Sequence, residues 1–305
     1  MRISTYNCLS SLYIPKNKGT PSEDGTKCTA YKCPYDTNTC ELQPEQTQYE
    51  RIKPMLPKII ESNVFFLQEL EQNTFLEIRK NEGRTWDSMY EPRYDTSNDM
   101  SPSVGSEDGC AVFIRPKAGG IDARDKETTI QTQIRSEMYN ENRGKPILVR
   151  VHNNICYMSF HANKTYITFL TDLLNILLPY DFQFIILGGD LNHKLEKLPD
   201  MSGYFGERAD TENVPTMTGE GETNWNQIDQ IIVYSKQQPE ISDVQVDDVV
   251  FNEGEAIRKV VTINARRPEY CQNTAFFKQW IDGKNPASDH RLLSCTLNLP
   301  IEHNK

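Results

Sequence analysis

Short apolar runs that end in polar residues recur along this chain. The clearest is residues 184–187, Phe-Ile-Ile-Leu, which are followed by Gly188, Gly189 and Asp190. Four consecutive apolar residues are typical of a strand buried on both faces, and the glycines would let the backbone turn as it leaves the sheet. Because side chains alternate along a strand, Asp190 and Asn192 are expected on the same side, beside one divalent cation or phosphate. Ordinary turn residues after a strand would explain this stretch equally well.

Seven other stretches are predicted to be strands, and most have a polar residue at one end. The strands are expected at residues 2–7, 63–70, 109–115, 146–151, 155–160, 228–234 and 291–299. The polar residues at their ends are Asn7, Glu69, Arg115, His161, Asp229, and Asp289 with His290. The fourth and fifth strands are predicted to form a hairpin, because the asparagines between them tolerate the positive φ of a tight turn.

The charged residues among these strand ends need partners. Burying an unpaired carboxylate is unfavourable. Glu69 could be paired with a metal ion or with an arginine or lysine, and Asp229 with a protonated histidine. Arg115 could contact a phosphate or form a surface ion pair. His161 could contact a phosphate or serve only as a hydrogen-bonded structural residue.

Three stretches show helical periodicity, at residues 48–62, 74–81 and 166–178. Pro54 and Pro57 interrupt the first stretch, which predicts a kink or two short helices, because a proline removes a helical hydrogen bond and clashes with the preceding turn. The alternation of strands and helices predicts a layered α/β fold, with helices packed outside the sheets.

The remaining stretches are polar or irregular. Residues 16–46 are predicted to form a surface insertion, and the spacing of its three cysteines favours an ordinary loop over a structural zinc site. Loops are expected at residues 84–108 and 194–226. Strand-like pieces are expected at 248–251 and 259–263, with a helix near 275–281.

Composition and charge narrow the possible functions. The 305 residues are expected to form a single domain, 1–305. The net charge of −10 gives no general attraction to nucleic acid or to anionic membranes, so a phosphate-bearing substrate would need a local site. There is no run of eighteen apolar residues and no signal-peptide pattern, which predicts a cytoplasmic protein without a transmembrane segment.

Six polar blocks together resemble a known family. They are Tyr6-Asn7, Gln68-Glu69, Ser159-Phe160-His161, Gly189-Asp190-Leu191-Asn192, Ile228-Asp229 and Ser288-Asp289-His290. In this order they resemble the endonuclease/exonuclease/phosphatase superfamily, which has the deoxyribonuclease I-like fold. The resemblance implies a four-layer α/β sandwich, with two mixed β-sheets face to face, helices outside and the active site at one rim of the sheets.

The same resemblance implies a role for each residue. Glu69, with Asn7 and Asp289, would hold Mg²⁺ or alternatively Mn²⁺. Asp190 would orient or deprotonate the attacking water, while Asn192 would position water and phosphate. Asp229 would hold His290 as an imidazolium facing the phosphoryl oxygens, and His161 would donate a further hydrogen bond. These groups suit phosphoester hydrolysis, in which negative charge builds up on phosphoryl and leaving oxygens.

The resemblance implies a Mg²⁺-dependent phosphoesterase. Residues 108–111, 5–9 and 228–231 look most like the deadenylase, nocturnin and 2′-phosphodiesterase branch, which favours RNA or a nucleotide as substrate. Two alternatives stay open. One is a phosphatase of phosphoinositides or inositol polyphosphates, and the other is a binding module that has kept the fold without catalysis.

Overall fold

A computed structural model gives the fold of most of the chain. It describes residues 1–8, 47–81, 86–95, 101–102, 108–115, 123–211, 214, 216, 227–247, 288 and 290–298. Several predictions from the sequence fall outside these residues: the insertion at 16–46 with its cysteines, the strand-like pieces at 248–251 and 259–263, the helix near 275–281, and Asp289.

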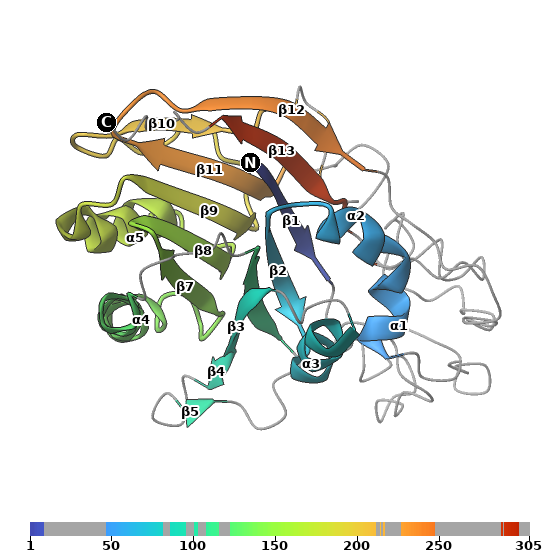
Figure 1. Ribbon diagram of the computed structural model, residues 1–305. Helices are drawn as coiled ribbons and strands as arrows, with labels where there is room; N and C mark the ends of the chain where they lie inside the picture. Colours follow the sequence, from blue (N-terminus) through green and yellow to red (C-terminus); the bar gives the residue numbers. More distant parts are fainter. Residues whose placement is uncertain are drawn as a thin grey trace, which may run out of the picture.

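Two mixed β-sheets form the centre of the molecule (Figure 1). The six-stranded sheet has the order β12-β13-β1-β2-β6-β3, with bounds Glu240–Val246, Leu293–Asn298, Arg2–Asn7, Val64–Leu70, Gly109–Ile114 and Asp87–Pro92. The five-stranded sheet has the order β10-β11-β9-β8-β7, with bounds Phe205–Arg208, Asp229–Ser235, Phe184–Asp190, Ile155–His161 and Ile147–His152. A two-stranded ribbon is formed by β4 (Tyr94–Asp95) and β5 (Ser101–Pro102).

The two sheets pack face to face through an apolar layer. It is built by alternate residues of the central strands, among them Phe66 on β2 and Ile186 on β9. Gly188 lies against this layer, because a Cβ added to it would lie 2.1 Å from the Cδ2 atom of Phe66. A Cβ on Gly189 would lie 2.1 Å from the carbonyl oxygen of Phe160. Neither glycine has a positive φ. Close packing, and not the predicted backbone freedom, therefore requires glycine at both positions.

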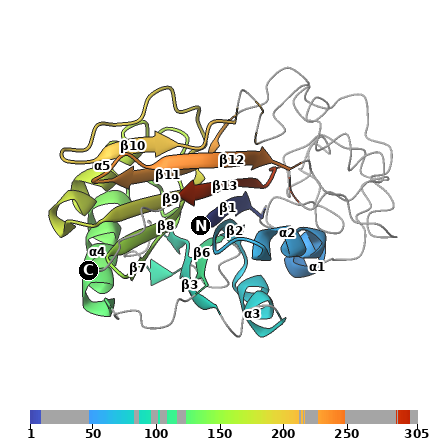
Figure 2. The same ribbon diagram turned by 45° about the horizontal axis from the view of Figure 1, so that its top comes forward.

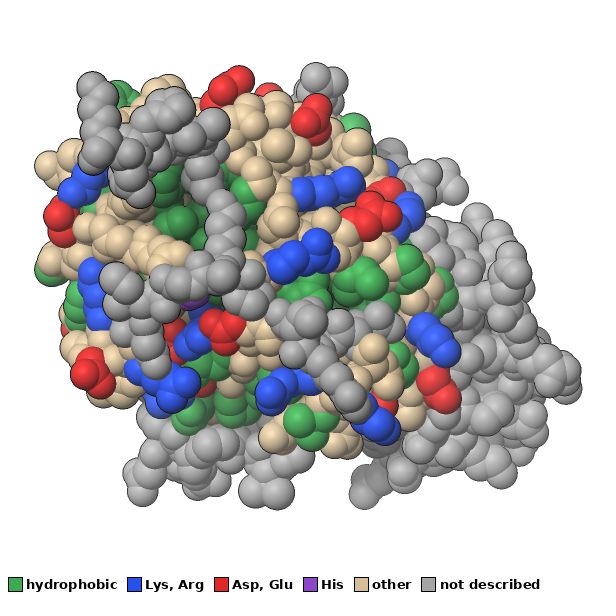
Figure 3. Space-filling view, in the orientation of Figure 1, with side chains coloured by type: hydrophobic (Ala, Val, Ile, Leu, Met, Phe, Trp, Pro, Cys, Tyr) green, Lys and Arg blue, Asp and Glu red, His purple; other side chains and the backbone are tan. Residues whose placement is uncertain are grey.

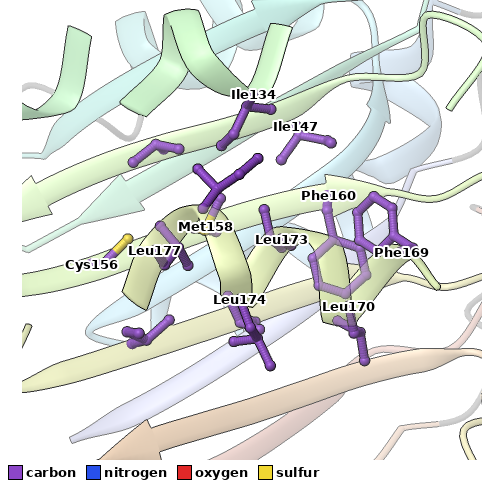
Figure 4. Close-up of a cluster of buried hydrophobic side chains, with 14 of the residues drawn as sticks. Ile134, Ile147, Cys156, Met158, Phe160, Phe169, Leu170, Leu173, Leu174 and Leu177 are labelled. Carbon is purple, nitrogen blue, oxygen red and sulfur yellow. The ribbon is translucent and has the colours of Figure 1, made fainter. Parts of the chain in front are cut away.

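Helices cover the outer face of each sheet (Figures 1 and 2). The six-stranded sheet is covered by α1 (Gln48–Ile52), α2 (Leu56–Ile60) and α3 (Gln72–Asn81). The five-stranded sheet is covered by α4 (Arg124–Met138) and α5 (Phe169–Leu177). Figure 4 shows Leu170, Leu173, Leu174 and Leu177 of α5 packed with residues of α4 and of the strands behind them. The arrangement is the predicted four-layer α/β sandwich.

Several local predictions are confirmed. The stretch with Pro54 and Pro57 is divided into α1, a 3₁₀ turn (Lys53–Met55) and α2. Asn153 and Asn154 have φ of 51° and 58°, as expected for the tight turn between β7 and β8. Helix α5 begins at Phe169, three residues later than predicted.

The structure also corrects the sequence analysis in four places. The stretches 84–108 and 194–226, predicted as loops, contain β3 and β10. Helix α4 and edge strand β12 were not predicted at all.

Among the residues described, no helix has both the length and the apolar character needed to cross a membrane.

Candidate active site

Five strands bring polar side chains to one edge of the sandwich. Strands β1 and β2 run parallel and pair Asn7 with Gln68 at their ends. In the second sheet, β8 runs parallel to β9, and its His161 pairs with Asp190. Strand β11 starts at this edge, where Asp229 pairs with Asp190 from the other side. The prediction that these strand-end residues lie together is thus met by the topology.

The amide of Asn7 joins the two sheets. Its Nδ2 atom donates hydrogen bonds to Glu69 Oε1 at 3.2 Å and to Asp190 Oδ2 at 3.1 Å. Asn7 is fully buried, while Glu69 and Asp190 are 7% and 1% exposed. A donor shared by two carboxylates reduces their mutual repulsion. Asn7 therefore fixes the distance between the acid of one sheet and the acid of the other.

A β-bulge directs the Glu69 side chain into this group. The pairing of β2 with β6 shifts register between Leu67 and Leu70, the segment that contains Glu69. Glu69 also has a φ of +50°, in the left-handed region that residues other than glycine rarely adopt. Bulges commonly redirect a side chain beside an active site. The sequence showed the acid at the strand end but gave no sign of the bulge.

The backbone after β9 turns sharply around Asp190. The N–H of Asn192 donates to Asp190 Oδ1 at 2.6 Å, and Asn192 has a φ of +55°. Its side-chain Nδ2 donates to the carbonyl oxygen of Ala162 at 2.9 Å. Strand alternation predicted Asp190 and Asn192 side by side, but the strand ends at Asp190. Asn192 therefore supports the carboxylate through its backbone N–H.

His290 and Asp229 form a buried pair. The Nδ1 atom of His290 lies 2.9 Å from Asp229 Oδ2 and 3.1 Å from Asp229 Oδ1, and its Nε2 atom lies 3.9 Å from Asp190 Oδ2. Burial raises the pKa of Asp229, and the adjacent His290 opposes that rise. The hydroxyl of Ser288 donates to the carbonyl oxygen of Asn7 and accepts from the N–H of His290, which fixes the histidine to the end of β1.

His161 has a second set of charged neighbours, two of which the sequence analysis missed. Its Nε2 atom lies 3.5 Å from Glu69 Oε1 and 3.8 Å from Asp190 Oδ2, while its Nδ1 atom lies 3.5 Å from Asp108 Oδ1. The Lys145 ammonium lies against His161 Nε2. Asp108 directly precedes a predicted strand, so the rule that found the other acids could have found it. Lys145 lies in a polar stretch that gave no signal.

Lys145 is held in place by a buried asparagine. Asn142 Nδ2 donates to the carbonyl oxygens of Lys145, at 2.9 Å, and of His161, at 3.0 Å. Burial lowers the pKa of Lys145, and the negative charges of Asp190, Glu69 and Asp108 oppose that effect. The site therefore contains one lysine and two histidines facing a group of acids.

Asp108 gives a prediction about acid stability. Burial raises its pKa, but His161, Arg93 and Lys145 together lower it more, to about 2, from an ordinary value of 3.8. A carboxyl with a lowered pKa in the folded state stabilises the protein above the unfolded pKa, and this stability is lost as the pH falls through the folded pKa. We expect Asp108→Asn to remove on the order of 2 kcal/mol of pH-dependent stability between about pH 4 and pH 2. Urea unfolding of both proteins across this range measures it, and parallel pH curves would contradict it.

The structure separates Arg115 from the other predicted site residues. Strand β6 is antiparallel to β2, so Gly109 is next to Leu70 near the site, while Ile114 pairs with Val64 at the opposite edge. Arg115 follows Ile114, donates to the carbonyl oxygen of Ile60 and lies 4.8 Å from the ring centre of Trp86. We therefore leave Arg115 out of the site. Asp289 lies outside the described residues, so its predicted role stays a prediction.

The donor set at this edge fits a divalent cation. Ligand atoms of Glu69, His161 and Asp190 lie within 4.8 Å of one another, and so do those of Asp190, Asp229 and His290. Mg²⁺ prefers a small number of carboxylates together with waters, and Mn²⁺ also accepts imidazole and carboxylate ligands. Four buried carboxylates lie at this edge, on Glu69, Asp108, Asp190 and Asp229. A cation beside Glu69 and Asp190 would reduce the repulsion between these two charges.

Fold and site together define a class of protein, a two-sheet α/β sandwich with buried carboxylates and histidines at one rim. No protein-family model and no curated protein sequence matches the chain.

Two solved structures are similar over nearly the whole chain, both with a TM-score of 0.50. One is a humanized D. rerio TDP2, with 13% identity over 98% of this chain and 99% of that chain. The other is an endonuclease/exonuclease/phosphatase family protein from Bacteroides thetaiotaomicron, with 10% identity over 99% of this chain and 98% of that chain. The chain therefore shares the fold of these two proteins, the deoxyribonuclease I-like fold that the sequence blocks predicted.

Proposed function

We propose that this protein is a divalent-metal-dependent phosphoesterase that hydrolyses a phosphodiester, most suitably one in RNA or a nucleotide. The observation that carries the proposal is the meeting of three groups at one rim. Glu69 and Asp190 both accept from the Asn7 amide, and His290 Nε2 lies 3.9 Å from Asp190 Oδ2. The similar protein from Bacteroides thetaiotaomicron is named for a family of nucleases and phosphatases, which supports phosphoester chemistry. The fold alone would be compatible with other functions.

The proposed roles follow from the contacts. Glu69, with Asn7 and Asp289, would hold Mg²⁺ or Mn²⁺. When bound, such a cation stabilises negative charge on the phosphoryl oxygens. Asp190 orients the attacking water and accepts its proton, and the N–H of Asn192 fixes its carboxylate.

The two histidines would face the phosphate from two directions. Each has a buried carboxylate on its Nδ1 side, Asp229 behind His290 and Asp108 behind His161. Each also has Nε2 within 4 Å of the same atom, Asp190 Oδ2. Asp229 behind His290 favours the imidazolium of His290, which can donate to a phosphoryl oxygen, and His161 would donate a further hydrogen bond. Lys145 would add a third positive donor on the side of His161.

The charge distribution favours a small or locally bound substrate. On the face shown in Figure 3, Lys and Arg side chains lie in separate small groups among Asp and Glu side chains. A long nucleic acid is usually bound by a continuous basic surface. We therefore propose that a nucleotide or the end of an RNA strand is held by the site itself.

A panel of substrates tests the proposal. Wild-type protein with Mg²⁺ is assayed on single-stranded poly(A) RNA, 2′,5′-linked oligoadenylate, NADPH, duplex DNA and phosphoinositides. We expect cleavage of an adenylate-containing phosphodiester. Turnover of phosphoinositides alone would favour the phosphatase alternative. Folded protein that binds Mg²⁺ and cleaves none of these would favour a binding module.

A further inference from the structure

Helix α1 makes two contacts with the strands that carry Asn7 and Glu69. The helix begins with a capping box, in which Thr47 and Glu50 bond reciprocally. Gln48, the first residue of the helix, reaches the end of β2, and Arg51 Nη1 donates to the carbonyl oxygen of Cys8 at 3.1 Å. Gln48 and Arg51 are 0% and 1% exposed. A buried amide and a buried guanidinium so close to the buried acids of the site require an explanation.

The Gln48 carboxamide bonds the backbone on both sides of Leu70, directly after Glu69. Its Nε2 atom donates to the carbonyl oxygen of Glu69 at 2.7 Å, and its Oε1 atom accepts from the N–H of Glu71 at 2.8 Å. This is the pair of groups that a neighbouring strand would engage. Glu69 lies in the bulge, where the pairing of β2 with β6 shifts register between Leu67 and Leu70. The carboxamide therefore stands in for a strand at this point.

The bond is important because Glu69 has an unfavourable backbone conformation. Its φ of +50° persists only where the surroundings enforce it. Without the Gln48 bonds, rotation of the backbone to a negative φ would move the carboxylate away from Asn7 and Asp190. We propose that Gln48 is a positioning residue that holds the Glu69 carboxylate at the metal site. The inference rests on the proposed function, since it assigns the metal to Glu69.

The chain offers a matched control. Gln131 on α4 also bridges a carbonyl oxygen and an N–H two residues apart, Ile147 O at 2.8 Å and Val149 N at 3.0 Å, with a longer contact to Glu91 Oε1 at 3.4 Å. Both glutamines are buried. Gln131 supports edge strand β7 of the five-stranded sheet, and its partners Ile147, Val149 and Glu91 do not lie on β2. Gln48→Met and Gln131→Met thus remove equivalent hydrogen bonds at different places.

Calorimetric titration with Mn²⁺ at pH 8 and a thermal melt test the inference. We expect both Met variants to melt at a lower temperature than wild type. Only Gln48→Met should bind Mn²⁺ more weakly, by about tenfold or more, as is typical when a group that orients a metal ligand is lost. Equal Mn²⁺ affinity in Gln48→Met and wild type would overturn the role of Gln48 and leave the proposed function standing. Absence of Mn²⁺ binding by wild type would overturn both.

Gln48→Glu covers the case in which the Met variant does not fold. A carboxylate still accepts from the N–H of Glu71 but opposes the carbonyl oxygen of Glu69. An added negative charge by itself would raise the affinity for a cation. We expect the affinity to fall instead, because the Glu69 backbone loses its donor. An unchanged or higher affinity would overturn the inference.

Discussion

Asp190→Asn is expected to lower phosphoester hydrolysis by about a thousandfold, the range lost when a general base is removed. The amide retains an acceptor for the N–H of Asn192 but can no longer take a proton from water. Asp190 also raises the pKa of Asp229 through its negative charge, so its neutralisation relieves repulsion among buried acids. This relief offsets the lost hydrogen bond from Asn7 Nδ2, so the variant should melt close to the wild-type temperature. Initial-rate assays and a thermal melt measure the two effects.

Asp87→Asn is the control for this variant. Asp87 pairs with Arg150 and lies opposite Ile114, at the edge of the sheet remote from the site. The Asp87→Asn variant should keep full activity. If Asp190→Asn retained more than about a tenth of wild-type activity, Asp190 would not be the base. If Asp190→Asn were inactive only because it had unfolded, the thermal melt would reveal this.

Glu69→Gln is expected to weaken the binding of Mg²⁺ or Mn²⁺ by about a hundredfold. The substitution removes the charge and leaves the carbonyl of the side chain near Asn7 Nδ2, which at 3.2 Å can still donate to it. A metal that binds only the folded protein raises the melting temperature in proportion to the logarithm of its concentration. The rise of melting temperature with added Mn²⁺ should thus be present in wild type and nearly absent in the variant.

Glu127→Gln separates this effect from a general loss of a buried acid. Glu127 is 5% exposed and pairs with Arg150 at 2.6 Å. The Glu127→Gln substitution should lower the melting temperature without changing how far added Mn²⁺ raises it. An undiminished response in Glu69→Gln would show that the cation binds elsewhere.

Local patterns along the chain were sufficient to predict much of the fold and part of the site. Apolar runs marked the central strands, and their polar ends marked Asn7, Glu69, His161, Asp190 and Asp229. Topology then brought together residues as far apart as Asn7 and Asp190, 183 positions along the chain. The prediction succeeded because strands that end at one edge of a sandwich place their terminal side chains together.

Elements with weak amphipathic patterns were missed. Helix α4 buries few apolar residues, mainly Ile130, Ile134 and Met138, among charged and polar ones. Edge strand β12 is only partly buried, so its side chains do not alternate clearly between apolar and polar. In both, the packing of the finished sandwich determines the structure more than local preference does.

The residues that support the site were also beyond local reading. Gln48 acts through backbone groups of Glu69 and Glu71, which have no signature in the sequence. Lys145 is a single lysine before a strand and gains meaning only beside His161. Arg115 showed the opposite error, because its position at a strand end did not reveal at which edge of the sheet that end lies.

The most direct test of the central claim is hydrolysis of bis(p-nitrophenyl) phosphate by protein stripped of metal with EDTA and then supplied with Mg²⁺ or Mn²⁺. The assay needs no knowledge of the natural substrate. If the rim at Asn7, Glu69 and Asp190 is the active site of a metal-dependent phosphoesterase, wild-type protein should show no turnover after stripping. Added cation should restore turnover in wild type but not in Asp190→Asn. Equal turnover with and without metal, or equal turnover by Asp190→Asn, would contradict it.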